Sequence, residues 1–173
     1  MTHSLGCRAL RLSVAEMEAG VREFPAGSND GPKIRLYRAG AWRHGLPLAA
    51  GPGPWCAYAA CWSAEVAWQE MPLDAPHPPH GWRASVYELV TDARAADAWR
   101  PAGAGYQPQP GDLAVFARDG QSPLTGGAGH VGRVESSTVD TVTSIDGNVG
   151  DRWARVTRPL AEVLGWIAYP LRV

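Results

Sequence analysis

One cysteine lies where its thiol could act as a nucleophile. Cys56 comes directly after Pro54-Trp55 and begins a segment, residues 55 to about 70, in which small apolar residues recur at helical spacing. A thiol in the first turn of a helix lies at the positive end of the helix dipole, which favours the thiolate and lowers the thiol pKa. Cys61 points about 140° away around the same helix. We therefore interpret Cys61, and also Cys7, as structural thiols.

A thiolate nucleophile needs a base and a group that orients the base. His130 opens a predicted strand after the glycine-rich segment 125–129, and the next predicted strand ends near Asp146. Asn148 lies two residues further, on the same face of that strand if it continues. This order of residue types matches what a cysteine–histidine–acid arrangement would require.

The register of the two strands decides whether the base and the acid meet. A hairpin centred on Thr138 would pair His130 with Asp146 and Val134 with Val142. Directly opposite side chains have Cβ atoms roughly 4.5–5.5 Å apart, close enough for a carboxylate to orient an imidazole. A slip of one residue would put His130 and Asp146 on opposite faces of the hairpin.

Simpler interpretations stand beside these assignments. A single histidine on a strand is often a structural residue, and Asp146-Gly147-Asn148 has the composition of a turn. His77-Pro-Pro-His80 offers two nitrogen ligands without a third, so we expect no metal site there.

Length and composition limit the function classes. The 173 residues are 45% hydrophobic and 19% charged, which is typical of one globular domain spanning residues 1–173. Sixteen Lys and Arg against seventeen Asp and Glu give a net charge of -1, which argues against a nucleic-acid binder. Three cysteines cannot all pair, so a disulfide framework is excluded. No apolar run is long enough to insert in a membrane and no signal peptide is present, so we expect synthesis as a soluble cytoplasmic protein.

The elements fall into helices followed by strands. Capping-box patterns at Ser13–Glu16 and Ser85–Glu88 predict two helices, the second running to about Trp99, and Pro32 fits the first turn of another. Alternating apolar residues predict five strands, at 112–118, 130–135, 139–145, 153–157 and 166–169. The order indicates an α+β fold, with N-terminal helices packed on an antiparallel sheet of about five strands.

Four sequence blocks resemble the CHAP domain, the cysteine, histidine-dependent amidohydrolase/peptidase family. They are Pro54–Trp62, Pro110–Phe116, Gly129–Val134 and Ile145–Asn148, in the family's order. The resemblance implies a papain-like fold, with residues 1–50 as a helical lead-in and 54–170 as the catalytic core.

The resemblance also implies roles for single residues. Cys56 would be the nucleophile and His130 the base, with no metal or organic cofactor. Asp146 stands where the family usually has Glu, and Asn148 matches an asparagine of the family, so either one would contact the imidazole. From their positions in the chain, Trp55 and Trp82 are candidates to line a substrate groove.

The activity implied is cleavage of amide bonds in peptidoglycan, within the stem peptide or cross-bridge or between sugar and peptide. One alternative is a papain-like protease or amidase acting on a non-wall substrate, and another is a catalytically decayed wall-binding module. The partner would be peptidoglycan, bound by a monomer, together with an immunity or delivery protein if the chain is a toxin. Without a signal peptide, it would reach the wall after holin-dependent release, as a bacteriolytic endolysin, or through a secretion machine or phage tail.

Overall fold

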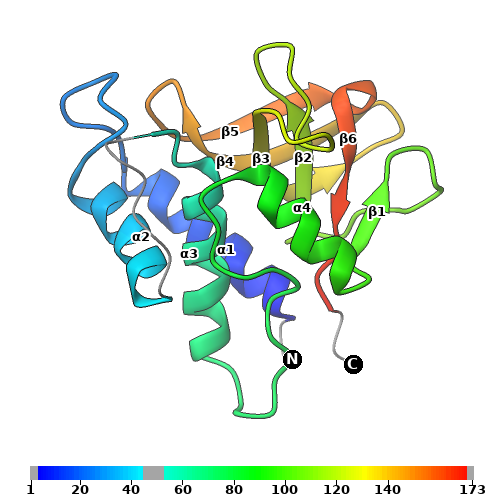
Figure 1. Ribbon diagram of the computed structural model, residues 1–173, viewed down its shortest axis with the longest axis horizontal. Coiled ribbons are helices and arrows are strands. Elements are labelled where there is room, and N and C mark those ends of the chain that lie inside the picture. The colour runs from blue at the N-terminus through cyan, green and yellow to red at the C-terminus, as the bar shows by residue number, and fades with distance from the viewer. Residues whose placement is uncertain (1–3, 45–52, 171–173) are drawn as a thin grey trace.

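The computed structural model describes residues 4–44 and 53–170, and in this part of the chain helices precede strands (Figure 1). The helices are α1 (Leu5–Glu18), α2 (Pro32–Arg43), α3 (Cys56–Gln69) and α4 (Val86–Ala95). The strands are β1 (Trp99–Pro101), β2 (Leu113–Ala117), β3 (Gly129–Ser137), β4 (Thr141–Val149), β5 (Arg152–Pro159) and β6 (Val163–Ile167), with a 3-10 turn η1 (Leu160–Glu162) between the last two.

The strands form one antiparallel sheet in the order β1-β6-β2-β3-β4-β5. The predicted α+β class, with helices on an antiparallel sheet, is confirmed, and the sheet has one strand more than expected. The additional strand is β1, because α4 ends at Ala95 and the chain around Trp99 pairs with β6 instead of continuing the helix.

Two helix starts agree with the capping and proline signals, and one does not. Ser85 accepts the Glu88 amide at 3.2 Å, and α2 begins at Pro32. The prediction that Ser13 starts the first helix is wrong. Ser4 caps α1, while Ser13 lies in the middle of the helix and donates its hydroxyl hydrogen to Ala9 O at 3.0 Å. Burial of Leu5 and Ala9 supports the two earlier turns, so packing overrides the local signal.

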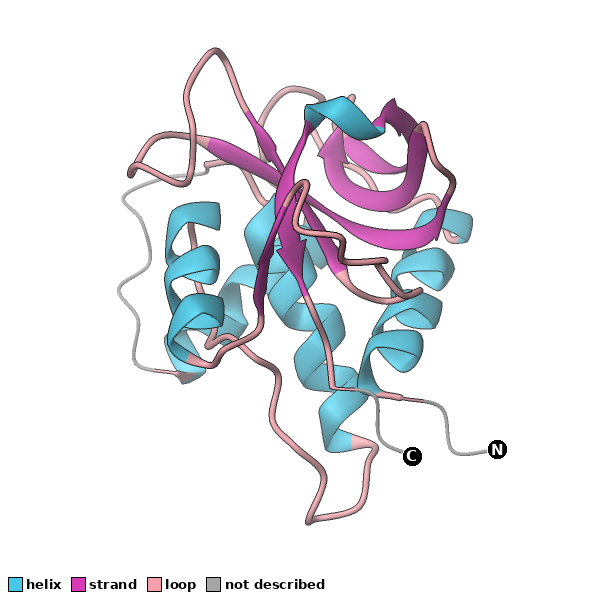
Figure 2. Cartoon of the chain, turned by 90° about the vertical axis from the view of Figure 1, so that its right-hand side faces the viewer, coloured by secondary structure: helices cyan, strands magenta, loops and turns pink. Residues whose placement is uncertain are grey.

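The helices cover one face of the sheet, which is strongly curved (Figure 2). Small residues of α3 are buried on nearly every side, with α1, α2 and the inner face of β3 and β4 around them. A second, smaller apolar cluster occupies the other face: Ala114, Phe116, Val134, Val142, Val163 and Trp166. Tight packing of α3 against β3 and β4 fixes the start of α3 relative to those two strands.

Two further predictions concern the extent of the fold. The expected division between a lead-in and a core, at residues 50 to 54, falls largely outside the described residues. No helix in the described part of the chain is long and apolar enough to cross a membrane.

Candidate active site

Cys56 is the first residue of α3, and its side chain is buried. The amides of a first helical turn have no partner within the helix, and together with the helix dipole they favour a negative charge. The sulfur also accepts a hydrogen bond from the Val131 backbone amide of β3. The backbone around Cys56 therefore favours the thiolate.

The His130 ring lies between this thiol and a carboxylate. Its Nε2 is 2.8 Å from Asp146 Oδ2, and its ring also hydrogen-bonds the Cys56 thiol. Because Nε2 faces the carboxylate, Nδ1 is the nitrogen that remains for the sulfur. Asp146 has no exposed surface, and His130 is buried as well. The structure thus brings Cys56, His130 and Asp146 into one buried chain of contacts.

The hairpin that carries His130 and Asp146 has a different register from the predicted one. Val134 lies opposite Ser144, not Val142, and a bulge follows before Ser136 pairs with Thr143. The turn is centred later than Thr138, whose hydroxyl oxygen accepts the amides of the two residues that lead into β4. The displacement is two residues, so each side chain keeps its face, and Asp146 reaches His130 from a diagonal position.

Two glycines give this site the space it needs. A Cβ on Gly132 would lie 1.9 Å from Asp146 Oδ1, so only glycine leaves room for the carboxylate at this point of β3. A Cβ on Gly147 would lie 2.7 Å from that of Ala59, which means that β4 passes directly against the first turns of α3. The close approach of strand and helix fixes β4, which carries the acid, against the start of α3, which carries the nucleophile.

The charged forms of the Cys56 thiol and the His130 imidazole stabilise each other. Burial raises the pKa of the Cys56 thiol, but the His130 hydrogen bond and charge, helped by Arg118, outweigh it and leave the pKa below its usual value. Burial lowers the pKa of His130, while its bonds to Asp146 and Cys56 outweigh that effect and raise it to about 9. The imidazolium therefore favours the thiolate, and the thiolate favours the imidazolium.

Sequence reasoning missed a second cation on the acid. Arg158 of β5 places Nη1 2.7 Å from Asp146 Oδ2, and its guanidinium lies 4.5 Å from the centre of the Phe116 ring. Arg158 shares the face of Ala154 and Val156, which pair with Asp146 and Ser144. An arginine that follows Ala154 and Val156 on one strand face was the available signal, but using it required the β4–β5 register.

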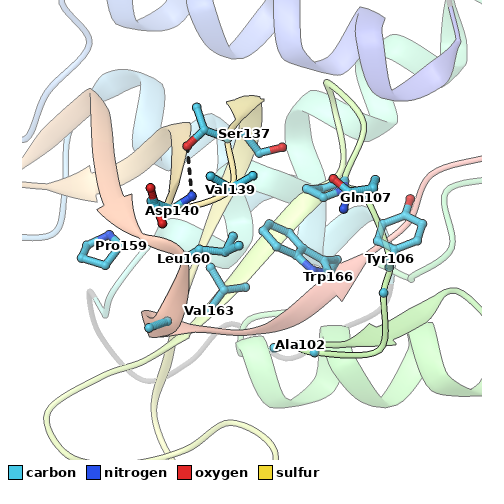
Figure 3. A pocket seen from close by; sticks show the side chains of 15 residues that line it. Ala102, Tyr106, Gln107, Ser137, Val139, Asp140, Pro159, Leu160, Val163 and Trp166 are labelled. Carbon is cyan, nitrogen blue, oxygen red and sulfur yellow. Dashed lines mark hydrogen bonds between the residues drawn. The ribbon is translucent and has the colours of Figure 1, made fainter.

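A hollow of about 320 Å³ opens beside the His130 ring. Its lining consists of Phe116, Ala117, His130, Arg158 and Glu162. A larger cavity, about 850 Å³, lies where the β3–β4 turn, η1 and residues 102–108 meet, with Trp166, Val163 and Leu160 among its lining (Figure 3). The larger cavity includes none of Cys56, His130 and Asp146, so it is not the place where this thiol would react.

Asn148 lies near the site, but its hydrogen bonds are to residues at and before the start of α3 and not to His130. With its amide oriented to satisfy both of its polar atoms, it donates to Glu23 Oε1 and accepts the Trp55 amide, each at 3.1 Å. Its contacts therefore hold the start of α3, and the imidazole contact belongs to Asp146.

The two tryptophans do not form the walls of a groove, which corrects the expectation for both. Trp55 is completely buried, and its Nε1 donates to Glu23 at 2.9 Å. Trp82 is 8% exposed, fits over Gly40 where a Cβ would clash, and stacks on the His44 ring. Each ring fills space next to the helices, so neither presents a face to a substrate.

The histidines of the proline-rich loop have structural contacts. His77 packs on the Trp68 ring, and the buried His80 bonds the Tyr169 hydroxyl through Nε2 at 2.5 Å. Within residues 4–44 and 53–170, no group of three or more His, Cys, Asp or Glu side chains is arranged to hold a metal ion.

Comparisons with known proteins place the chain in a family. Two crystal structures of Ly7917, one with "the hydrolyzing product of MDP", are 19% and 20% identical, with TM-scores of 0.43 and 0.44. Each similarity covers 66% of this chain and 53% of the other, so the chain spans about half the length of these proteins. No curated protein matches. The family model of the CHAP domain matches residues 49–148, more than half of the chain, and the protein therefore belongs to the CHAP-domain family of amidohydrolases and peptidases.

Proposed function

We propose that this protein hydrolyses amide bonds of peptidoglycan, with Cys56 as the nucleophile and His130 as the acid–base. The observation that supports it best is the buried chain of contacts from the Cys56 thiol through the His130 ring to Asp146. Membership of an amidohydrolase and peptidase family gives the reaction class. A structural thiol needs neither a charged imidazole nor a carboxylate behind that imidazole.

The reaction follows from the charges of the resting site. The Cys56 thiolate attacks the amide carbonyl, and the Cys56 backbone amide donates a hydrogen bond to the resulting oxyanion. The carbon–nitrogen bond then breaks as the His130 imidazolium gives its proton to the leaving amine. Neutral His130 next takes a proton from water, whose oxygen attacks the thioester, and cleavage of the carbon–sulfur bond restores the thiolate and releases the acid.

The substrate and the place of action are further parts of this proposal. Peptidoglycan is the substrate that the family resemblance implies, with the stem peptide, the cross-bridge and the sugar–peptide junction as candidate bonds. The protein acts as a monomer on the wall after release by a holin or delivery by a secretion machine. A delivered toxin would have an immunity protein as its partner.

The two cysteines of α3 provide the test of the nucleophile. Cys56→Ala should abolish release of soluble fragments from purified cell walls, because no other thiol contacts His130 among the described residues. Cys61→Ser should keep full activity, since a hydroxyl can replace the buried thiol in its bonds to the Gly81 and Arg83 backbone. Retained activity in the Cys56 variant would exclude the mechanism.

The same digests separate wall hydrolysis from general proteolysis. Mass spectrometry of muropeptides should show a new amine and a new carboxyl at one kind of bond. Casein should remain intact under the same conditions. Cleavage of casein with intact muropeptides would instead assign the protein to proteases of a non-wall substrate. Failure on both substrates, with a Cys56 thiol that iodoacetamide does not label, would favour a binding module.

A further inference from the structure

We propose that Arg158 is a positioning residue for His130, acting through Asp146. This inference rests on the proposed role of Cys56 and His130. Arg158 fixes the carboxylate that orients the imidazole, and its charge keeps the imidazolium from becoming too weak an acid to protonate the leaving amine.

The contacts of Asp146 show why its carboxylate needs a second partner. The group is fully buried in β4, and Oδ2 alone receives both Nε2 of His130, at 2.8 Å, and Nη1 of Arg158, at 2.7 Å. Oδ1 has no hydrogen-bond partner among the described residues. Without Arg158, the imidazole would be the only hydrogen-bond partner of this buried carboxylate among the described residues, and one bond does not fix both of its torsions.

The Arg158 side chain is itself held in place. Its guanidinium packs over the Phe116 ring, and Nη1 lies 3.4 Å from the Ser144 hydroxyl. Phe116 pairs with His130 across β2 and β3, with ring centres 6.2 Å apart. The guanidinium, the Phe116 ring and the imidazole therefore form one packed unit around the carboxylate.

The charges around His130 determine the expected sign. Cys56 of α3 and Asp146 of β4 stabilise the imidazolium. The Arg158 guanidinium of β5 lies 2.7 Å from the same Asp146 oxygen and carries a like charge, and a like charge disfavours the imidazolium. Arg118, after β2, acts on the thiol, and Glu162 of η1 lines the same hollow as the ring. With Arg158 present, the four groups Cys56, His130, Asp146 and Arg158 carry two positive and two negative charges in the ion-pair state. Removal of Arg158 leaves one excess negative charge, which raises the His130 pKa.

A purely structural ion pair would behave differently. It would contribute to folding stability, and its loss would lower activity only as far as it unfolds the protein. It would leave the turnover of the folded molecules unchanged. The turnover per folded molecule, read together with the His130 pKa measured without substrate, therefore distinguishes positioning from structural support.

The experiment is an NMR titration of the histidine rings in the full-length protein, with wild type compared with Arg158→Gln. The His130 pKa should rise by about one unit in the variant. Turnover of cell walls at neutral pH should fall about tenfold or more, a part of what acid–base catalysis contributes. Arg155→Gln is the matched control, because Arg155 lies on the same strand and pairs with Glu135 at 2.7 Å on the exposed surface. It should change neither quantity.

An unchanged or lowered His130 pKa in folded Arg158→Gln protein would overturn the inference. If the glutamine variant does not fold, Arg158→Met replaces it, since an apolar side chain can stay packed over Phe116, and the same rise is expected. A raised pKa in a protein whose wild type does not digest cell walls would reject the proposed function and leave the positioning role intact.

Discussion

Helix α3 carries two cysteines that are similarly buried but whose thiol pKa values shift in opposite directions. Cys56 is 4% exposed and Cys61 is 2% exposed, so both thiols lie in a medium that penalises a charge. The pKa of Cys56 is nevertheless lowered, whereas burial raises the pKa of Cys61 to about 12. The difference arises from the neighbours of each sulfur: a charged imidazole at Cys56, and backbone groups of Gly81 and Arg83 at Cys61.

Two buried histidines show the same contrast. His80 lies close to the Cys61 region and bonds the Gly81 carbonyl and the Tyr169 hydroxyl, both uncharged. Burial lowers the pKa of His80 to about 4, so its ring is neutral. His130 is buried to a similar degree, but the bond to Asp146 and the contact with Cys56 raise its pKa to about 9. The buried carboxylate of Asp146 is thus what separates the charged His130 from the neutral His80.

Replacement of each histidine should produce the largest difference between the two regions. His130→Ala removes the proton donor and the cation that holds the thiolate, so hydrolysis of cell walls should fall by about 10³-fold or more. His80→Gln should retain hydrolysis, because a glutamine amide can still bond the Tyr169 hydroxyl. Initial rates on purified walls measure both. Equal losses in the two variants would mean that the contrast between the sites is not catalytic.

The acid side of the stability profile should depend on His80. Its folded pKa of about 4 lies below the unfolded value of 6.5, so the unfolded chain binds the extra proton between these values. The free energy of unfolding should therefore fall by roughly 3 kcal/mol from this residue as the pH drops from 6.5 to 4. His130 has the opposite sign, and its contribution is lost as the pH rises from 6.5 to about 9.

Urea unfolding at several pH values checks this prediction. His80→Gln should remove most of the decline on the acid side, and His77→Gln, a change in the same loop, should leave it in place. An acid slope that is the same in wild type and His80→Gln would show that the buried ring does not control it.

A smaller loss of activity should follow when the Asp146 carboxylate is displaced without replacement of any titrating group. Gly132→Ala adds a Cβ that would lie 1.9 Å from Asp146 Oδ1, so the carboxylate must move away from His130. Wall hydrolysis should fall about tenfold or more, part of the acid–base contribution. Gly53→Ala is the control, because a Cβ there meets no heavy atom within 4 Å among the described residues. Full activity in the Gly132 variant would show that the position of the carboxylate is not critical.

The sequence was most informative where one local pattern determines the outcome. The start of α3 at Cys56 and the Ser85 cap of α4 follow from short-range signals, and the shared face of His130 and Asp146 follows from the two-residue period of strands. An even shift of register does not change that face, which is why the site geometry was robust to an error in the turn.

Features set by tertiary packing could not be derived in this way. Ser13 has the pattern of a helix start, but buried Leu5 and Ala9 extend α1 before it. Trp55 was expected at a surface groove and is a core residue, because its indole is bound by Glu23, 32 positions earlier in the chain. Arg158 meets Asp146 only through the β4–β5 register, which no local signal specifies.

The pH dependence of Cys56 alkylation, followed peptide by peptide, tests the central claim most directly. In wild type at pH 7, iodoacetamide should modify Cys56 about tenfold or more faster than Cys61, because the pKa of the Cys56 thiol is lowered while burial raises the pKa of Cys61 to about 12. In His130→Ala the Cys56 rate should fall about tenfold or more, since the thiol loses its cation while burial remains. Equal rates at the two cysteines, or a Cys56 rate that does not change in His130→Ala, would contradict the account.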